Sequence, residues 1–469
     1  MIDDRRSGQN YRFRTGLPVT IKGCLCAALL LAMVAPGCAP PEVGTPDADV
    51  IQVDAPTGQA EVDRAVVQAA LDGVPPGGTV QLAAGTYLLG AGVNLVVPDV
   101  TLQGHPDGTV LRGCDPEVME FPAPPAEPNP MAIIQNCSGL YVLADRQTIR
   151  DLTIEYAWHG IFVGTPPWLP ADENSSTSSS GGHTIENNLF RYTPNGVRVV
   201  GPAEQPTVIA NNEVRNAFHA FQANGAAVHF LNNRISVPEP HAVPSSHHPE
   251  SGVIVNTWGM EGHHCEGSRV EGNIIEGTVN GIQILADPGQ TCTGHVIRDN
   301  EIRLGEVPLA GDYPDYLRDF FFGPGAVGSS ATGTAIRLHG QPGSTPDEPA
   351  GRVTDVLVEN NRLSGGFGLA MQLRNASSNR LIGNRITDIK RRDPFPGLTW
   401  GEDPTVWRDA NGSAIWISEG SDLNQLEGNS FEGIEASAVM IQGDENELIL
   451  GDEESKVEDR GQGNQIRRP

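Results

Sequence analysis

A short phrase with a central asparagine recurs along this chain. It reads apolar-x-x-Asn-x-apolar, as in residues 185–190 and 209–214. Further copies lie around Asn233, Asn273, Asn300, Asn361, Asn384 and Asn429. Successive copies are roughly 21–27 residues apart or about twice that distance, except for the interval between Asn300 and Asn361, which we interpret as two periods plus an insertion. A period of this size is typical of a solenoid, in which each repeat buries its apolar face against its neighbours.

The segments around these phrases favour strands. They are short, rich in Val and Ile, punctuated by Gly and Asn, and they alternate apolar with polar residues. Repeats of short strands without helices predict a β-helix, whose coils stack about 4.8 Å apart. Asparagine tolerates left-handed backbone at a tight corner, and its amide can bond to the coils above and below. Ordinary turns of a β-sandwich are the alternative, but they do not recur in one phrase at one period.

Four cysteines support the same period. Cys114 precedes Cys137, and Cys265 precedes Cys292, by about one coil each. Residues stacked one coil apart lie within disulfide range. The spacing therefore predicts the disulfides Cys114–Cys137 and Cys265–Cys292. Four free thiols are the alternative, and they fit an exported protein less well.

The N-terminal residues 1–37 have the pattern of a bacterial export signal peptide. Basic residues precede an apolar stretch at 25–35 that is too short for a stable membrane anchor. The stretch ends in Ala-Pro-Gly-Cys, which resembles the lipobox of bacterial lipoproteins and implies lipidation of Cys38. Residues 38–50 look like a flexible tether. We expect a bacterial cell-envelope protein, either anchored to the outer membrane through Cys38 or secreted after cleavage elsewhere.

The net charge of −27 restricts the partners. It favours solubility and argues against nucleic acid. It also argues mildly against a strongly polyanionic substrate, unless a local basic groove or Ca²⁺ compensates. Acidic residues are plentiful enough for Ca²⁺, although no Asp-x-Asp-x-Asp loop occurs. We expect a monomer.

Residues 60–72 form the one convincing amphipathic helix. Val62, Ala65, Val66 and Ala69 share one face. The end of a β-helix exposes an open coil that needs covering, so we expect this helix to plug it.

The sequence after this helix carries a family resemblance. Gly-Thr-Val-x-Leu-x-x-Gly-Thr-Tyr occupies 78–87, and Val-Thr-Leu-x-Gly occupies 100–104. This opening, with the asparagine phrases, resembles right-handed parallel β-helix proteins of the pectate-lyase-like superfamily. The resemblance implies a single all-β domain: a cap helix and first coils in 51–114, repeats with loop insertions in 115–450, and a polar C-terminal tail in 451–469. That superfamily includes polysaccharide lyases, glycoside hydrolases, epimerases and adhesins.

The short catalytic motifs of the best-known branches are missing. The only Asp-Asp pair is Asp3-Asp4, in the signal peptide, and no Arg-x-Lys occurs, unlike in polygalacturonase-like hydrolases. The Arg-x-Pro-x-x-Arg of pectate lyases and the Tyr-Gly-x-Asp-Pro-His type of motif of alginate epimerases are also missing. Several lyase branches use a lysine base, for which Lys390 is the one candidate.

Aligning one strand of each coil predicts an outward-facing surface. Side chains alternate along a strand, so the middle residue of each apolar pair points out. The predicted outward column is Phe162, Arg198, Gln222, Gln283, Arg337, Gln372, Trp416 and Met440. The predicted neighbouring column is Asn224, Asn256, His339, Arg374, Ser418 and Gln442.

This surface suits a glycan. Guanidinium groups pair with carboxylates, amides bond hydroxyls, and an indole stacks on a sugar ring. The predicted substrate-binding residues are Arg198, Gln222, Asn224, Asn256, Gln283, Gln372 and Trp416. The predicted catalytic residues are Arg337, His339 and Arg374, with the arginines neutralising a uronate carboxylate and the histidine as general base or acid. A solvated sheet face is the alternative.

Loop insertions are expected to wall this surface. They span about 115–131, 165–182, 238–250, 305–331, 341–351 and 391–410. The pairs His247-His248 and His263-His264 lack chelating spacing and are better read as polar loop residues than as metal ligands. The family resemblance thus implies a polysaccharide-active protein, either a lyase or a hydrolase acting on an extracellular glycan. The alternative is a surface adhesin, or another glycan-binding or structural protein, without catalysis.

Overall fold

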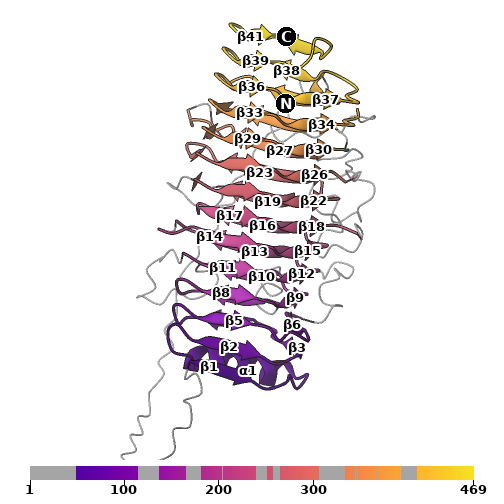
Figure 1. The fold of residues 1–469 in the computed structure, drawn as a ribbon. Helices are drawn as coiled ribbons and strands as arrows, with labels where there is room; N and C mark the ends of the chain where they lie inside the picture. The colour runs from indigo at the N-terminus through magenta and orange to yellow at the C-terminus, as the bar shows by residue number, and fades with distance from the viewer. Residues whose placement is uncertain are drawn as a thin grey trace, which may run out of the picture. The chain divides into compact units, whose positions relative to one another are not determined.

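The computed structural model describes residues 49–114, 137–164, 181–202, 204–238, 251–256, 265–305, 333–343, 345, 347–366, 368–391 and 409–469. Through these residues the chain runs repeatedly from one sheet to the next, and each strand pairs in parallel with the strand one coil away (Figure 1). Three long sheets, here called A, B and C, line the coils, and a short sheet D lies at one corner. The described chain is therefore a parallel β-helix.

Sheet A holds the strands that open each coil. In stacking order they are β1 (Val50–Val53), β2 (Thr79–Leu82), β5 (Thr101–Gln103), β8 (Thr148–Arg150), β11 (Thr184–Glu186), β14 (Thr207–Ala210), β17 (Val228–Leu231), β21 (Arg269–Glu271), β25 (Val296–Arg298), β29 (Leu357–Glu359), β33 (Arg380–Ile382), β36 (Gln425–Glu427), β39 (Glu447–Ile449) and β41 (Gln465–Arg467).

Sheet B follows after a sharp corner. Its strands are β3 (Gly85–Leu88), β6 (Thr109–Arg112), β9 (Thr153–Glu155), β12 (Leu189–Arg191), β15 (Glu213–Arg215), β18 (Arg234–Ser236), β22 (Ile274–Glu276), β26 (Glu301–Arg303), β30 (Arg362–Ser364), β34 (Arg385–Thr387) and β37 (Ser430–Glu432).

Sheet C contains the longest strands. They are β4 (Val93–Leu95), β7 (Leu140–Val142), β10 (His159–Val163), β13 (Asn195–Val200), β16 (His219–Asn224), β19 (Ser251–Asn256), β23 (Asn280–Ala286), β27 (Gly333–Gly340), β31 (Gly368–Arg374), β35 (Ser413–Ile417), β38 (Val439–Ile441) and β40 (Val457–Asp459). Sheet D consists of β20 (Cys265–Glu266), β24 (Thr291–Thr293), β28 (Arg352–Thr354) and β32 (Ala376–Ser377).

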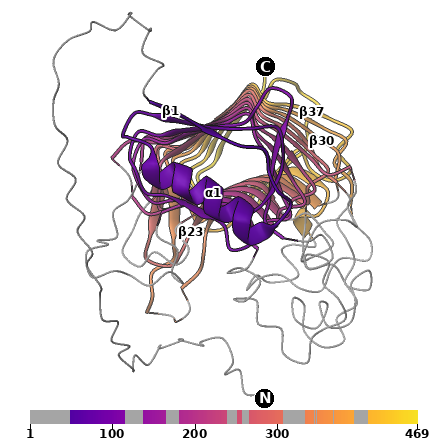
Figure 2. The same ribbon diagram turned by 90° about the horizontal axis from the view of Figure 1, so that it is seen from below.

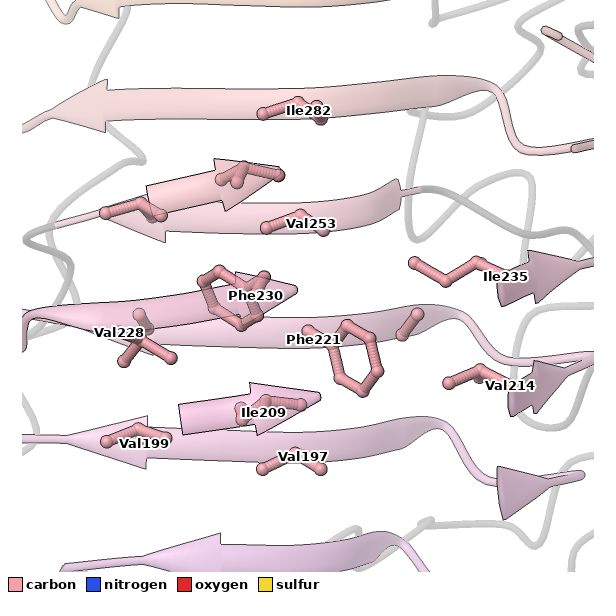
Figure 3. Packing of buried hydrophobic residues seen from close by; sticks show 14 of the residues in the cluster. Val197, Val199, Ile209, Val214, Phe221, Val228, Phe230, Ile235, Val253 and Ile282 are labelled. Carbon is pink, nitrogen blue, oxygen red and sulfur yellow. The ribbon is translucent and has the colours of Figure 1, made fainter. Parts of the chain in front are cut away.

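The core is a stack of aliphatic and aromatic side chains inside the coils. Val197, Phe221, Val253 and Ile282 follow one another in register along sheet C and are fully buried (Figure 3). Strands that alternate around such a core gain stability chiefly from burying these side chains. The strand period of the sequence reflects this arrangement directly.

The repeated asparagines form a hydrogen-bonded ladder at the corner between sheets A and B. Each asparagine after the first accepts a bond at its side-chain oxygen from the backbone N–H of the ladder asparagine one coil before, at 2.9–3.0 Å. The ladder runs through Asn188, Asn212, Asn233, Asn273, Asn300, Asn361, Asn384 and Asn429. Its members are at most 3% exposed, so the amides satisfy backbone groups that water cannot reach. The predicted bonding between coils is confirmed.

The left-handed corner, however, lies one residue before each ladder asparagine. Asn187, Asn211, Asn232, Asp299 and Asn360 have φ between 54° and 57°. Gly272 and Gly383 occupy the same place in other coils, with φ of 66° and 62°. The prediction that the repeated asparagine itself is left-handed is therefore wrong for this ladder. Its amide makes the inter-coil bonds, and its predecessor makes the turn.

Helix α1 (Ala60–Gly73) lies across the N-terminal end of the coils, as Figure 2 shows. The predicted cap is therefore present, but its predicted buried face is wrong. Asp63, Val67, Ala70 and Leu71 are the buried residues of the helix. The carboxylate of Asp63 accepts hydrogen bonds from the backbone N–H groups of residues 57, 58 and 88, which is why an acidic residue can lie inward.

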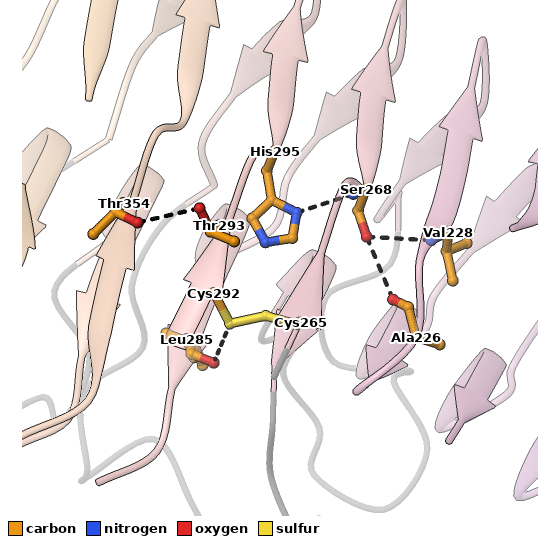
Figure 4. Close-up of a disulfide and its surroundings, with 9 residues drawn as sticks. All are labelled: Ala226, Val228, Cys265, Ser268, Leu285, Cys292, Thr293, His295 and Thr354. Carbon is orange, nitrogen blue, oxygen red and sulfur yellow. Dashed lines mark hydrogen bonds between the residues drawn. A yellow bond between two sulfur atoms is a disulfide. The ribbon is translucent and has the colours of Figure 1, made fainter. Parts of the chain in front are cut away.

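Both predicted disulfides are present. Cys114–Cys137 and Cys265–Cys292 each join neighbouring coils, with Cα–Cα distances of 5.0 Å and 4.5 Å. Figure 4 shows the second, beside His295. The segment 451–469, predicted to be a polar tail, instead contributes β40 to sheet C and β41 to sheet A, so the solenoid continues to its last strands.

Several predictions concern residues outside the described ranges. They are the signal peptide, the lipidation of Cys38, most of the tether, the two histidine pairs and most of the loop insertions. Within the described residues, no helix is long and apolar enough to cross a membrane.

Candidate functional site

The residues of the predicted outward column of sheet C pair in register from one strand to the next. The chain of strand pairs joins Tyr141, Phe162, Arg198, Gln222, Ile254, Gln283, Arg337, Gln372, Trp416 and Met440. We call this set the central column. The sequence alignment missed two of its members, Tyr141 and Ile254. Tyr141 lies before the first aligned strand, and Ile254 is an apolar residue flanked by Val253 and Val255.

The downstream column lies two residues further along each strand. It contains Val200, Asn224, Asn256, Leu285, His339 and Arg374. The structure thus places the predicted residues Asn224, Asn256, His339 and Arg374 in one row. Ser418 and Gln442 directly follow β35 and β38.

A third row, the upstream column, was not predicted. It contains His159, Asn195, His219, Ser251, Asn280 and Thr334. The strand pairing skips Gly160 and Gly196 between this row and the inward residues Ile161 and Val197. A strict two-residue alternation therefore assigns the wrong face to these side chains. A histidine followed by a glycine at the start of a strand was the sequence signal from which this column could have been recognised.

Most of this surface is buried, so the alternative of a solvated sheet face is wrong. Gln222, Gln283, Gln372 and Trp416 are at most 3% exposed. Partly exposed side chains of these columns occur at two places: Arg198 with Val200 and His219, and Arg337 with Leu285 and Arg374 on the two neighbouring strands. The accessible part of sheet C is thus mainly cationic.

Arg337, His339 and Arg374 come together as predicted. Nη1 of Arg374 lies 3.3 Å from Nε2 of His339 on the neighbouring strand. Burial, and then the charges of Arg337 and Arg374, hold the pKa of His339 well below its ordinary value of 6.5. The imidazole is therefore neutral at neutral pH, beside two cations.

Amide side chains continue the row toward the N-terminal coils. Nη1 of Arg337 donates to Oε1 of Gln283 at 3.4 Å, and Nε2 of Gln283 donates to Oγ of Ser251. Oδ1 of Asn256 is buried and has no hydrogen-bond partner. A buried acceptor without a partner is costly, which marks this position for a ligand donor or a water molecule.

A second cationic position lies four coils away in the central column. Arg198 packs its guanidinium 5.9 Å from the ring centroid of Phe162, and burial lowers the Arg198 pKa to about 10. At that pKa the group stays charged. His159 contacts the same ring edge-on at 5.1 Å, and burial followed by the charge of Arg198 holds the His159 pKa well below 6.5.

Trp416 is not available as a stacking platform. Its indole is 2% exposed, donates from Nε1 to Oε1 of Gln442 at 2.8 Å, and packs with Leu369, Ala410 and Met440. The predicted stacking role is therefore wrong in this structure. Trp416 pairs with Gln372 on the neighbouring strand.

Carboxylates are missing from the described centre of this surface. Between β10 and β35, none of the three columns contains Asp or Glu. Lys390, the candidate lysine base, is exposed beyond the end of β34 in sheet B. It lies in none of the three columns.

One group of metal-ligating side chains occurs among the described residues. Cys265, Cys292 and His295 bring ligand-type atoms within 4.8 Å of one another. The two sulfurs already form a disulfide, and Nδ1 of His295 accepts a bond from the backbone N–H of Ser268 at 3.1 Å (Figure 4). These contacts are structural: His183 makes the same bond to Gln147 in an earlier coil.

Comparisons with known proteins identify similar folds but no related sequence. No family model and no curated protein sequence matches the chain. Among solved structures, the tailspike protein of E. coli bacteriophage HK620 matches with a TM-score of 0.50 and 12% identity. The match covers 83% of this chain and 63% of the tailspike, so the chain spans less than two thirds of that protein.

Two further similar structures are bacterial enzymes. The A-module of the Azotobacter vinelandii mannuronan C-5 epimerase AlgE4 matches with a TM-score of 0.47 and 14% identity, over 87% of this chain and 94% of that one. The Yersinia enterocolitica family 28 exopolygalacturonase matches with a TM-score of 0.44 and 12% identity, over 87% and 79%. The tailspike match shows the right-handed parallel β-helix fold that the sequence resemblance predicted.

Proposed function

We propose that the protein binds a uronate-containing polysaccharide at Arg337 and Arg374 and cleaves it by β-elimination, as a lyase. The observation that carries this proposal is the contact of His339 Nε2 with Nη1 of Arg374, with Arg337 two residues before His339 on the same strand. Guanidinium groups pair well with carboxylates. A neutral imidazole can accept a proton. A chain of net charge −27 with cations gathered at one point supports a local site for an anionic glycan.

The chemistry follows from this placement. The two arginines would bind the uronate carboxylate and stabilise the negative charge that develops when the C5 proton is removed. Nε2 of His339 would take that proton. The C5–H electron pair would form the C4=C5 double bond, and the C4–O bond would break toward the leaving sugar. The released oxygen would take a proton from water.

Substrate binding would also tune the base. Both arginines lower the pKa of His339 in the unliganded protein. A bound carboxylate neutralises their field, so the pKa of His339 rises toward its ordinary range. The imidazole would thus become a stronger base when substrate is in place.

Hydrolysis is less well supported. Glycoside hydrolysis ordinarily uses two carboxyl groups that flank the scissile bond. No carboxylate lies in the three described columns between β10 and β35. The described groups suit proton abstraction better than acid-assisted hydrolysis.

A substrate panel tests this proposal. The protein is incubated, with and without Ca²⁺, with pectin, alginate, glycosaminoglycan and neutral polysaccharides. Ultraviolet absorbance of unsaturated ends and new reducing ends are followed together. We expect absorbance with one uronate polymer, lost in His339→Asn and retained in His229→Asn, a histidine of β17 in sheet A. Reducing ends without absorbance would mean a hydrolase. Binding without either product would mean a non-catalytic glycan-binding protein or adhesin.

We also propose export to the cell envelope, with lipid attached to Cys38. The two disulfides support an oxidising compartment. Intact mass measurement of the membrane-extracted protein tests the anchor. We expect a chain that begins at Cys38 and carries lipid, and Cys38→Ala should release it. An unlipidated chain with a different start would mean simple secretion.

A further inference from the structure

The N-terminal end of the solenoid carries an unpartnered apolar surface. Four valines there have 40–50% of their surface exposed: Val50 in β1, Val62 and Val66 in α1, and Val96 just after β4. Strands β1 and β4 are the first of sheets A and C, and α1 lies across the same end (Figures 1 and 2). The four valines therefore gather at one end of the described chain.

The exposed side of α1 carries an apolar stripe. Val62, Ala65, Val66 and Ala69 recur at helical spacing and are all exposed. The opposite face, which packs on the first coils, includes the buried carboxylate of Asp63. A cap needing only a soluble outer surface would carry its valines inward and its charges outward. Exposed apolar faces of this kind mark interaction surfaces.

The length of chain before β1 indicates what covers this surface. Val50 lies twelve positions after Cys38 in the sequence. An extended segment of that length spans about 40 Å at most. A lipid on Cys38 would therefore keep this end of the solenoid within a short distance of the bilayer, whereas the last coils lie at the other end of the stack.

We propose that the outer face of α1, defined by Val62, Ala65, Val66 and Ala69, rests on the lipid surface to which Cys38 anchors the protein. This inference depends on the proposed lipidation. The area is small, so the contact orients an already anchored protein rather than recruiting a free one. Its occupant is a bilayer rather than a second copy of the chain.

The charges around the face predict which lipids suit it. Glu61 and Asp72 on α1 and Asp49 and Asp54 beside β1 are exposed, against Arg64 alone on the helix. An acidic rim is repelled by an anionic leaflet and accepts a zwitterionic one. The contact should therefore be stronger on phosphatidylcholine vesicles than on vesicles with added phosphatidylglycerol.

The test uses single-thiol labelling of the full, lipidated protein in vesicles. The chain has seven cysteines. Four are in disulfides, Cys38 would carry the lipid, and Cys24 and Cys26 would leave with the signal peptide. An introduced cysteine is then the one free thiol. An environment-sensitive fluorophore is placed at Val66→Cys and, as a matched control, at Ser430→Cys, an exposed residue of β37.

The two proposals can fail separately in this test. We expect the fluorophore at position 66, but not at 430, to be quenched at least twofold by lipid-attached quenchers. A Val62→Glu variant of the labelled protein should lose that quenching while its lipid remains. Equal quenching at the two positions, with lipid confirmed by mass, would overturn the inference alone. A concentration-dependent dimer without quenching at 66 would also overturn it. No lipid on Cys38 would overturn both proposals.

Discussion

His339 accepts a hydrogen bond from Arg374 across the pairing of β27 with β31, with 3.3 Å between Nε2 and Nη1. A guanidinium group can only donate, so the lone pair of His339 lies on Nε2 and its proton on Nδ1. The base that the proposed elimination needs is therefore already in the neutral tautomer. In the proposed reaction, the substrate carboxylate would have to draw the Arg374 guanidinium away from this lone pair before Nε2 could take a proton.

The first prediction concerns the pKa of this histidine. Arg374→Met removes one of the two cations that disfavour the imidazolium, so the pKa of His339 should rise. NMR titration of the ring resonances measures it. Arg362→Met, at an exposed position of β30 in sheet B, should leave the value unchanged. An unchanged or lower pKa in Arg374→Met would contradict the electrostatic account.

The rate of elimination should follow the same residue. His339→Asn removes the base while keeping an amide of similar size, so kcat should fall by about 10²–10⁴-fold. KM for the uronate polymer should change little, because the arginines make the contacts to the carboxylate. A raised KM with an unchanged kcat would mean that His339 contributes to substrate binding instead of catalysis.

Acid stability provides an independent prediction. Burial lowers the pKa of His295 to about 4, against an unfolded value of 6.5. Between these two values the unfolded chain binds more protons than the folded one, so stability is lost as pH falls from about 6.5 to about 4. The loss from this one residue is about 3 kcal/mol. His159 and His339 act in the same direction.

The variant His295→Asn isolates that contribution. Asn379 accepts the same kind of backbone bond, from the N–H of Val356 at 3.0 Å, so asparagine suits this corner. Urea unfolding near pH 7 and near pH 4.5 should show a smaller difference in the variant than in the wild type. An identical pH dependence would mean that His295 is already protonated in the folded state.

The asparagine ladder should be a major source of stability. In Asn300→Ala, the backbone and amide N–H groups of Asn273 lose their acceptor, and the carbonyl of Val270 loses its donor. Leaving these buried groups unsatisfied should cost about 3–5 kcal/mol in the free energy of unfolding. A second asparagine ladder runs from Asn379 through Asn424 and Asn446 to the partly exposed Asn464. Asn464→Ala should cost about 1 kcal/mol. Equal losses would contradict the role of burial.

The left-handed backbone at the position before each ladder asparagine can be tested by a pair of substitutions. Asn360 has φ of 55°, and glycine occupies the same place at 383. Asn360→Gly should therefore be nearly neutral, while Asn360→Val should cost about 1–2 kcal/mol because a β-branched residue resists this conformation. Thermal unfolding of the two variants measures the difference. Similar melting temperatures would mean that the corner relaxes.

The period of the sequence was sufficient to predict the fold, because every coil buries the same positions. The same period predicted the in-register central column and both disulfides. It could not predict the upstream column with His159 and His219, since the pairing skips Gly160 and Gly196 there. It also could not predict which face of α1 lies inward: valines occur on both faces, and the inward one depends on hydrogen bonds that Asp63 makes to distant backbone groups.

The burial of the surface was equally beyond the sequence. Gln372 and Trp416 occupy outward strand positions, where alternation predicts exposure, yet both are buried. Exposure depends on which parts of the chain fold over a strand, and strand alternation carries no information about that. The closeness of Arg337 and Arg374 was predicted, because it depends only on the register between neighbouring strands.

The central claim is that guanidinium groups on sheet C bind the carboxylates of a uronate chain. Calorimetric titration with one oligouronate and with its carboxyl-reduced counterpart tests it most directly, using the wild type, Arg337→Gln and the control Arg362→Gln. The account predicts that the wild type and Arg362→Gln prefer the carboxylated form by at least tenfold and that Arg337→Gln loses most of this preference. Equal affinity of the wild type for the two oligosaccharides would contradict it.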